Sequence, residues 1–587
     1  MKKQIKFVVA VFAAGFIFCA GAAEAAREYI WPTGKMPDRQ AHQIAAMTNE
    51  SGRKGFDRSK FQEPYLDWYE APANSATNRP CMILISGGSY QCCCDVGLIK
   101  QWRETFTKLG CQCVNFVYRT PRPKGLPIYQ TAWEDGQRAV RVVRSQAAKR
   151  GFDPEKIGVI GMSAGGHLTV MLATSALTPA YQPVDDLDKL PCHINWAIAN
   201  APAYNTLGGA TGNPTPQDGT SVIPSINPCF KFDAKTCPIS FHHGGRDPYT
   251  PNGSTLCYRE LRKRKIPTEL HLYADLKHGA HGLERGVEFM RQMGFLGKLG
   301  REVDLMKRYP NDNARAGYEK QLVWPEGKMP NRQLKADGKD AQCTPYIEWH
   351  QPKELKTRAI QIIYSGGGYG GNSPDGFEVA PMRRYLNEKG MTVVTMRYRT
   401  PRPKGLAKHV TAWQDLQRAI RLVRSQAAAR GLDPDRIGIM GSSAGGHLTL
   451  MGAFSSKQAA YPAIDELDKI SCTVQWGIPI YPAYALTDGA DCHNKTGGND
   501  DAAVPVPEFA FDAGTCPLCF IHGDADGWAS MNSVKCWEKL RLMGIQCDLH
   551  TLALRPHCFQ RKAAPGTGSY TWMDRAWDFL SRKGFNK

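Results

Sequence analysis

The chain has 587 residues, 42% of them hydrophobic and 22% charged, which is an ordinary globular composition and too much chain for one compact core. The formal net charge is +19, but the basic residues are scattered and accompany no nucleic-acid motif, so no nucleic-acid partner is expected. After residue 20 no apolar run is long enough to span a bilayer.

The N-terminus has the order of an export signal. Three lysines within the first six residues precede an apolar run at 7–20, and small residues follow up to Ala25. This order predicts a secretory signal peptide over residues 1–25, cleaved after Ala25. We therefore expect a secreted or periplasmic protein that has no membrane segment after cleavage.

The rest of the chain is a repeat. The heptapeptide that begins at Ser163 recurs 280 positions later at Ser443, and residues 119–126 recur unchanged as 399–406. The period is far too long for a solenoid, so it indicates a duplicated domain. The expected division is a first domain at 26–310, a polar linker at 311–317 and a second domain at 318–587.

Within each copy, short apolar runs alternate with longer amphipathic ones. The predicted strands cover 81–85, 113–118, 156–160 and 238–242 in the first copy, and 359–364, 392–396, 436–440 and 517–521 in the second. Helical spacing covers 131–150 and 411–430. This alternation predicts the α/β class, with two tandem domains that are each a mostly parallel sheet flanked by helices.

A serine motif follows the third of these strands in each copy. Gly161-Met-Ser163-Ala-Gly165 and Gly441-Ser-Ser443-Ala-Gly445 both match G-x-S-x-G between a predicted strand and a predicted helix. Glycines two positions away let such a serine sit on a strained turn without a steric collision. The helix N-terminus adds a field that favours a developing oxyanion. The motif therefore predicts Ser163 and Ser443 as nucleophiles.

A serine nucleophile needs a base and an acid, and with this motif the chain order is serine, acid, histidine. The register of the repeat pairs Asp247 with Asp526 and His278 with His557. The predicted triads are Ser163–Asp247–His278 and Ser443–Asp526–His557. The alternatives that stay open are His281 as the base of the first domain and Asp524 as the acid of the second. His243 and His522, four residues before the acids, are interpreted as packing or supporting groups.

Acyl transfer also needs amide donors for the oxyanion. Glycine-rich turns at 86–90 and 365–369 follow early strands, where this architecture supplies one donor. We expect the amides of Gly88 and Ala164 to serve the first site and those of Gly367 and Ala444 to serve the second.

Cysteines recur at matching places, which suggests bridges in an exported protein. Cys192–Cys237 and Cys472–Cys516 are the hypotheses. The run from Cys92 to Cys94 has no partnering pair, so no metal site is expected, and serine chemistry needs no organic cofactor.

Several of these motifs together resemble a known family. The Gly-Gly-Gly-Tyr turn at 366–369, the Gly-x-Ser-Ala-Gly-Gly-His elbow, the helix from Asp415 to Arg424 and the Trp-Pro-x-Gly-Lys-Met-Pro opening of each copy are similar to bacterial acetyl xylan esterases and related carbohydrate esterases. These enzymes belong to the esterase/lipase branch of the α/β-hydrolases. The second domain matches more closely, since the first carries Ser89 in place of the third glycine.

The resemblance implies a serine carboxylesterase that removes acetyl groups from an acylated polysaccharide such as xylan. A feruloyl esterase, a peptidase of the prolyl-oligopeptidase type, and a non-catalytic carbohydrate-binding role for one domain stay open. The segments 203–235 and 483–514 differ strongly between the copies. We therefore expect the two sites to prefer different esters.

Overall fold

The computed structural model describes residues 26–39, 63–69, 78–93, 96–206, 225–308, 320–487 and 500–587. The predicted signal peptide at 1–25 and the linker at 311–317 lie outside these ranges and stay predictions. Within the described ranges no helix is both long and apolar enough to cross a membrane.

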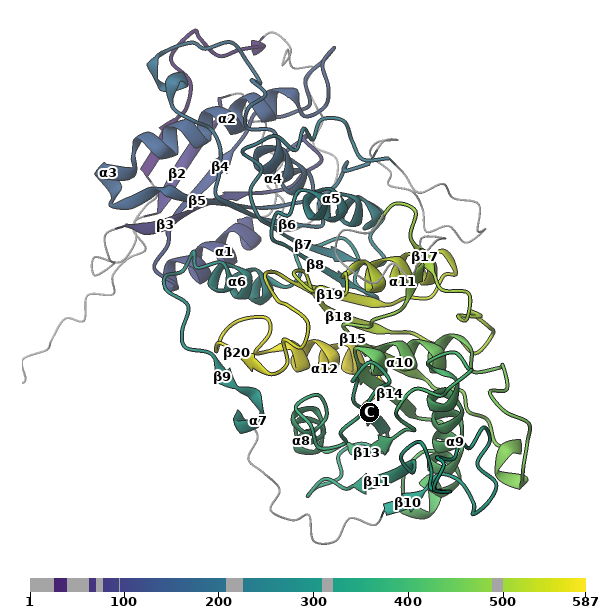
Figure 1. Ribbon diagram of the computed structural model, residues 1–587. Coiled ribbons are helices and arrows are strands. Elements are labelled where there is room, and N and C mark those ends of the chain that lie inside the picture. Colours follow the sequence, from purple (N-terminus) through teal and green to yellow (C-terminus); the bar gives the residue numbers. More distant parts are fainter. Residues whose placement is uncertain are drawn as a thin grey trace, which may run out of the picture.

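Two halves repeat one succession of strands and helices (Figure 1). The strands of the first half are β1 (Ala26–Tyr29), β2 (Tyr65–Tyr69), β3 (Arg79–Ile85), β4 (Gln112–Val117), β5 (Phe152–Met162), β6 (Trp196–Asn200), β7 (Ile239–Gly244) and β8 (Thr268–Tyr273). Its helices are α1 (Val96–Lys108), α2 (Gln130–Ser145), α3 (Ala147–Arg150), α4 (Ala164–Thr174), α5 (Asn252–Lys263) and α6 (Leu283–Gln292). The short β9 (Val303–Asp304) and α7 (Leu305–Arg308) follow.

The second half has the same plan. Its sheet strands are β10 (Lys320–Leu322), β11 (Tyr346–His350), β12 (Ile360–Tyr364), β13 (Thr392–Arg397), β14 (Ile437–Ser442), β15 (Trp476–Ile480), β18 (Cys519–Gly523) and β19 (Asp548–Leu552), with small β16 (Leu486–Thr487), β17 (Val504–Pro505) and β20 (Lys562–Ala563) outside the sheet. Its helices are α8 (Ala380–Glu388), α9 (Val410–Ala427), α10 (Ala444–Phe454), α11 (Met531–Leu542) and α12 (Trp572–Lys583).

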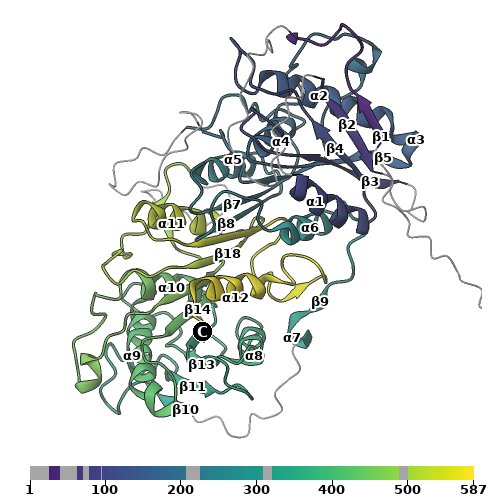
Figure 2. The same cartoon turned by 180° about the vertical axis from the view of Figure 1, so that it is seen from behind.

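In each half, six strands run parallel and the two outermost strands are joined by antiparallel pairing. Helices α1 and α6 cover one face of the first half, and α2, α4 and α5 cover the other (Figures 1 and 2). The second half places α8 and α12 opposite α9, α10 and α11. The predicted α/β class with helix-flanked parallel sheets is confirmed.

The two sheets are joined into one, which the sequence analysis did not predict. Strand β8 pairs antiparallel with β19, so the sheet is continuous over 16 strands. His271 lies opposite His550, and Leu272 opposite Leu549. This β8–β19 pairing is the seam between the two halves. It covers the last strand of each half, which would otherwise be an unpaired edge.

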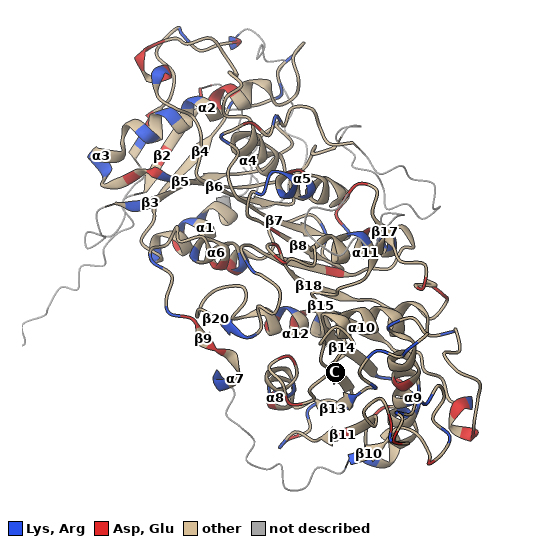
Figure 3. Cartoon of the chain, in the orientation of Figure 1, with Lys and Arg blue, Asp and Glu red and all other residues tan. Residues whose placement is uncertain are grey.

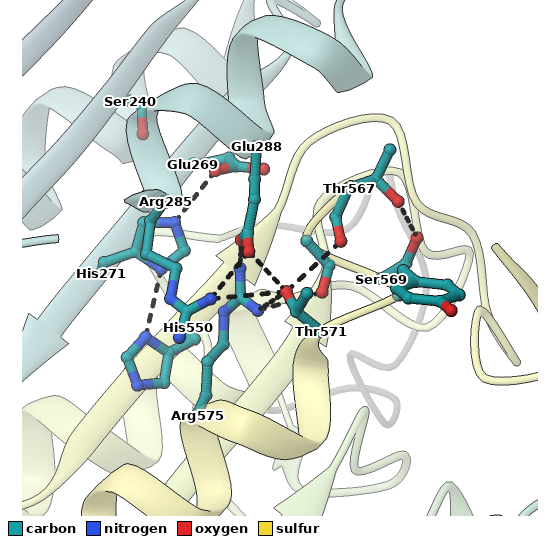
Figure 4. Close-up of polar contacts among 12 residues, drawn as sticks. Ser240, Glu269, His271, Arg285, Glu288, His550, Thr567, Ser569, Thr571 and Arg575 are labelled. Carbon is teal, nitrogen blue, oxygen red and sulfur yellow. Dashed lines mark hydrogen bonds and ion pairs between the residues drawn. The ribbon is translucent and has the colours of Figure 1, made fainter. Parts of the chain in front are cut away.

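Helices support this seam with buried polar contacts. Arg575 of α12 donates to Glu288 of α6 at 2.8 Å, and Thr571 donates to the same carboxylate at 2.7 Å (Figure 4). Lys583 reaches Asp275 at 2.7 Å. Elsewhere Lys and Arg alternate with Asp and Glu over both halves (Figure 3). The halves are thus held by a shared sheet and by paired charges.

The hydrophobic core is divided between the two faces of the sheet. One apolar cluster runs through both halves beneath α2, α4, α5, α9, α10 and α11, whereas the face of α1 and α6 and the face of α8 and α12 each have their own. Every residue of α4 and of α10 is buried. At about 1.5–3 kcal/mol for each large apolar side chain buried, these two helices are fixed firmly against the sheet. They are the helices that follow the serines.

The disulfide hypotheses are wrong. Cys192, Cys237, Cys472 and Cys516 are free, buried thiols. In each copy the first cysteine points to a backbone carbonyl: Sγ of Cys192 lies 3.3 Å from the oxygen of Ala176, and Sγ of Cys472 lies 3.2 Å from that of Ser456. Matching positions in a repeat indicated matching environments rather than bonded partners.

Candidate active site

Both serines sit on sharp turns between strand and helix. Ser163 has φ 58° and Ser443 has φ 55°, values that L-residues rarely adopt. A Cβ at Gly441 would lie 2.5 Å from the carbonyl oxygen of Gly445, and a Cβ at Gly445 would lie 2.6 Å from that of Ser365. Only glycine fits at these two places, so the sterics of the motif are those expected from the sequence.

In the second half, the three predicted residues meet. Nε2 of His557 lies 2.9 Å from Oγ of Ser443, and Nδ1 of His557 lies 2.8 Å from Oδ2 of Asp526. Asp526 is fully buried, whereas the His557 side chain is 22% exposed. An imidazole held in this way can take the proton of the hydroxyl, while the carboxylate fixes its tautomer and stabilises the imidazolium.

The acid is kept ionised by its neighbours. Burial alone raises the pKa of Asp526, but hydrogen bonding to His522 and His557 outweighs that effect and holds the pKa well below its usual range. Nε2 of His522 lies 3.3 Å from Oδ2 of Asp526, and its Nδ1 lies 2.8 Å from the hydroxyl of Ser533. His522 therefore contacts the acid and not the nucleophile.

The first half repeats the acid–base pair. Nδ1 of His278 lies 2.7 Å from Oδ2 of Asp247, and the ring of Tyr249 lies 4.9 Å from that of His278. Oγ of Ser163 makes no hydrogen bond to any described residue. His243 lies 3.2 Å from Asp247 and matches His522.

The two alternative residues are not brought to the sites. His281 contacts the carbonyl oxygen of Lys277 at 2.7 Å instead of the acid. Asp524 accepts a hydrogen bond from Tyr258 at 2.7 Å across the seam. The repeat register selected the pairs that the fold brings together.

The glycine turns lie directly against the serines. A Cβ at Gly366 would lie 2.7 Å from Cβ of Ser443, and one at Gly87 would lie 2.9 Å from Cβ of Ser163. The next residues, Gly367 and Gly88, have φ values of 88° and 124°. Their amides belong to the turn that flanks each hydroxyl, and Ala444 and Ala164 begin the helices on the other side.

The two turns have the same shape despite the Ser89 substitution. Ser89 has φ 55° and its counterpart Gly368 has φ 61°. The second arginine of each repeated Arg-Thr-Pro-Arg motif fastens the turn: Nε of Arg122 donates to the carbonyl oxygen of Ser89, and Nε of Arg402 to that of Gly368, both at 2.8 Å. The first arginine is structural, since Arg399 binds the buried Asp415 at 2.9 Å.

Behind the second site lies a buried polar network that the sequence analysis missed. Glu378 accepts a hydrogen bond from the amide of Gly366 at 2.8 Å and lies 3.2 Å from the hydroxyl of Tyr481. The Tyr481 hydroxyl also contacts Gln560, and its ring meets the ring of His557 at 4.6 Å. Burial raises the pKa of Glu378. The network connects the glycine turn to the base.

The first half lacks this network. At the matching repeat positions it has Leu98, Ala201 and His281 in place of Glu378, Tyr481 and Gln560. A comparison of the copies at these positions would have marked the difference from sequence alone. The two halves thus share a triad arrangement but not the groups behind it.

A cavity of about 350 Å³ opens beside the second site. Its lining residues come from the glycine turn and the segment before α8 and are Ser365, Gly366, Gly367, Gly371, Asn372, Ser373, Gly376, Phe377 and Glu378. The cavity could receive a small part of a substrate whose reacting carbon lies at Ser443.

Two serine elbows at the ends of parallel strands, each followed by an acid and a histidine after later strands, define an α/β-hydrolase. A family model described as BD-FAE matches residues 66–184 and 347–540, together more than half of the chain. The chain belongs to the BD-FAE family. A model of the prolyl oligopeptidase family matches residues 130–300.

Relatives include endo-1,4-beta-xylanase B of Butyrivibrio fibrisolvens, 28% identical over 36% of this chain and 33% of the relative. The acetylxylan esterase of Xylanibacter ruminicola is 25% identical over 38% of this chain and 45% of the relative. This chain therefore spans less than half the length of these relatives. Among solved structures, the acetyl ester-xyloside bifunctional hydrolase of Caldicellulosiruptor lactoaceticus matches 46% of this chain and 97% of its own, at 24% identity and TM-score 0.36.

Proposed function

We propose that this protein is an exported serine carboxylesterase that removes acetyl groups from a hemicellulose such as xylan. The observation that carries the proposal is the continuous contact from Ser443 through His557 to Asp526, at 2.9 and 2.8 Å. The names of the relatives, a xylanase and an acetylxylan esterase, support the choice of substrate. The N-terminal sequence supports export, and a mature chain beginning at Ala26 would test it.

In the proposed reaction, Oγ of Ser443 attacks the ester carbonyl carbon while its proton passes to Nε2 of His557. The amides of Gly367 and Ala444 bind the oxyanion of the tetrahedral intermediate. When the intermediate collapses, the bond to the sugar oxygen breaks and His557 protonates that oxygen. Water, deprotonated by the same imidazole, then cleaves the acyl-enzyme and releases acetate. Asp526 stays ionised throughout and stabilises the imidazolium.

For the first half we propose the same chemistry at Ser163, with His278 and Asp247 and with the amides of Gly88 and Ala164. The conserved shape of the glycine turn supports this role in spite of Ser89. The absent polar network and the different loops support a different ester preference. Retention of this half only for carbohydrate binding is the alternative outcome.

Acetate release from acetylated xylan by wild type, Ser163→Ala, Ser443→Ala and the double variant tests the proposal. We expect partial loss in each single variant and only background in the double variant. Loss confined to Ser443→Ala would remove acetyl esterase activity from the first half. Absence of acetate release by wild type would refute the substrate, and feruloyl esters and prolyl peptides would then be assayed, the latter because of the prolyl oligopeptidase match.

A further inference from the structure

Three potential metal ligands meet in the second half, behind the elbow helix. His409 precedes the first residue of α9, His447 lies in the first turn of α10, and Glu508 comes from the segment before β18. One ligand atom from each residue lies within 4.8 Å of the others. Two imidazoles and a carboxylate are a donor set that suits zinc and its first-row neighbours.

The separations fit one small ion. Oε1 of Glu508 lies 3.6 Å from Nε2 of His447 and 3.7 Å from Nδ1 of His409. Zinc bonds of about 2.0–2.2 Å in tetrahedral geometry place neighbouring ligand atoms about 3.3 Å apart. A small inward movement of these side chains would therefore close the set, and a water could take the fourth position.

His447 is poised to bind in the required tautomer. Its side chain is fully buried, and its Nε2 makes no hydrogen bond among the described residues. Nδ1 lies 2.8 Å from the hydroxyl of Tyr369, which can accept the ring proton when Nε2 holds a metal. A buried imidazole nitrogen aimed at a carboxylate and another imidazole, without a hydrogen bond of its own, is an independent sign of a missing ligand.

The entrance is also present. The Glu508 side chain is 27% exposed and that of His409 is 10% exposed, so an ion can arrive from solvent.

The first half offers the natural comparison. His167 matches His447, and each ring lies 5.2 Å from a matching phenylalanine, Phe230 or Phe509. There Cys229 replaces Glu508, with Sγ 3.5 Å from Nε2 of His167, and Tyr129 replaces His409. The first half therefore lacks two of the three ligands and fills the position with a thiol contact.

We propose that His409, His447 and Glu508 form a binding site for one divalent transition-metal ion, with zinc as the probe. The ion would join the start of α9, the start of α10 and the segment of Glu508. Through Tyr369 it would also brace the glycine turn, because Tyr369 is the last residue of that turn. The binding claim does not depend on the proposed esterase activity.

The test is a titration of the full-length, reduced, metal-stripped protein with Zn²⁺ by calorimetry and with Co²⁺ by absorption spectroscopy. We expect one tight equivalent, weakened at least about 100-fold by His409→Ala and by Glu508→Gln, and about tenfold by Tyr369→Phe. Bound Co²⁺ should give visible d–d bands without a thiolate charge-transfer band. Cys229→Ala in the first half is the matched control and should leave binding unchanged.

Circular dichroism of the metal-free variants separates lost ligands from lost fold, and Glu508→Gln, at a partly exposed position, is the variant least able to unfold the chain. Binding that survives both ligand variants overturns the proposal, as does the absence of a stoichiometric equivalent. A thiolate band that disappears on alkylation would assign the metal to cysteines instead and would also overturn it.

Discussion

At the scale of single residues, the two sites differ in what supports them. In the second half the carboxyl of Glu378 holds the Gly366 amide and faces the hydroxyl of Tyr481, whose ring meets the catalytic candidate His557. The first half has Leu98 where the second has Glu378. Since buried donors without acceptors are costly, this position should matter only in the second site.

Glu378→Leu should therefore lower kcat/KM of the second site about tenfold, because the buried Gly366 amide loses its acceptor at a cost of about 1–3 kcal/mol, whereas the Tyr481 hydroxyl keeps Gln560. The measurement is ester hydrolysis in a Ser163→Ala background. Glu378→Gln keeps an acceptor oxygen and should retain most of the rate. An unchanged kcat/KM in the leucine variant would show that the network is only packing.

The residues of the triads could be predicted because their chemistry restricts residue type and the repeat supplies a register. Glu378, Tyr481 and Gln560 could not, since they are far apart in sequence and carry no motif. Only the fold brings them together. Their trace in the sequence is a set of mismatches between two otherwise similar copies.

At the scale of elements, the glycine turn after β12 is the most constrained segment near the serine. A Cβ at Gly367 would lie 2.0 Å from the carbonyl oxygen of Gly371, and φ is 88°. The turn after β3 has the same restriction at Gly88, where a Cβ would lie 2.0 Å from the oxygen of Cys92. Backbone contact and positive φ together fix the loop shape.

Gly367→Ala should destabilise the protein by about 1 kcal/mol for its positive φ and by a further ~2 kcal/mol for the contact. Gly405→Ala is the matched control, because Gly405 has φ 71° and nothing within 4 Å of a Cβ. Chemical denaturation measures both free energies of unfolding. Equal losses in the two variants would mean that the turn relaxes around the methyl group.

The strands and helices themselves were largely predictable, because alternating short apolar and longer amphipathic runs have few other structural solutions. The cysteine pairing failed at this same scale. Spacing located Cys192 and Cys237 correctly in matching contexts, but the direction of a thiol depends on packing, and the thiol of Cys192 turns to the carbonyl oxygen of Ala176.

At the scale of the whole molecule, a row of four buried side chains crosses the seam. Glu269 lies 2.9 Å from Nε2 of His271, and Nδ1 of His271 lies 3.1 Å from Nδ1 of His550 (Figure 4). Nε2 of His550 in turn lies 3.4 Å from Asp548. Two neutral histidines can satisfy all these contacts if Glu269 carries a proton and Asp548 does not. Burial raises the pKa of Glu269 to about 8, whereas the pKa of Asp548 is lowered: hydrogen bonding to His550 and the charge of Arg582 outweigh burial.

This assignment predicts a pH dependence of stability. The folded chain keeps a proton on Glu269 that the unfolded chain loses above about pH 4.5, so the contribution of Glu269 to the free energy of unfolding should fall as pH rises from there to about 8. Between pH 6 and 8 this contribution should fall by about 2 kcal/mol, and Glu269→Gln should make the measured decrease smaller by that amount. Urea unfolding at several pH values measures the slope.

Asp548→Asn is the matched control. Its lowered pKa places its own pH effect below about pH 4, so the variant should keep the wild-type slope between pH 6 and 8 whatever it costs in absolute stability. A wild-type slope that persists in Glu269→Gln would assign the titration to another group.

The seam itself could not be predicted from sequence. Leu270-His271 and Leu549-His550 were visible as counterparts, but which edge of a sheet meets which is decided by the surfaces of whole domains. The pairing register reveals what the repeat alone did not, namely that position 271 faces its own counterpart.

A surface that meets its own copy is the hallmark of an isologous homodimer. The β8–β19 pairing therefore has the form of a symmetric dimer whose subunits became one gene product. In evolutionary terms, fusion releases such an interface from self-complementarity, since a mutation on one side no longer appears on the other. At matching repeat positions the halves carry Glu269 and Asp548 in the seam strands, and Ser240 and Cys519 in the strands beside them, and these are divergences of this kind. The same release lets one half acquire a polar network, or a metal, that the other never has to accommodate.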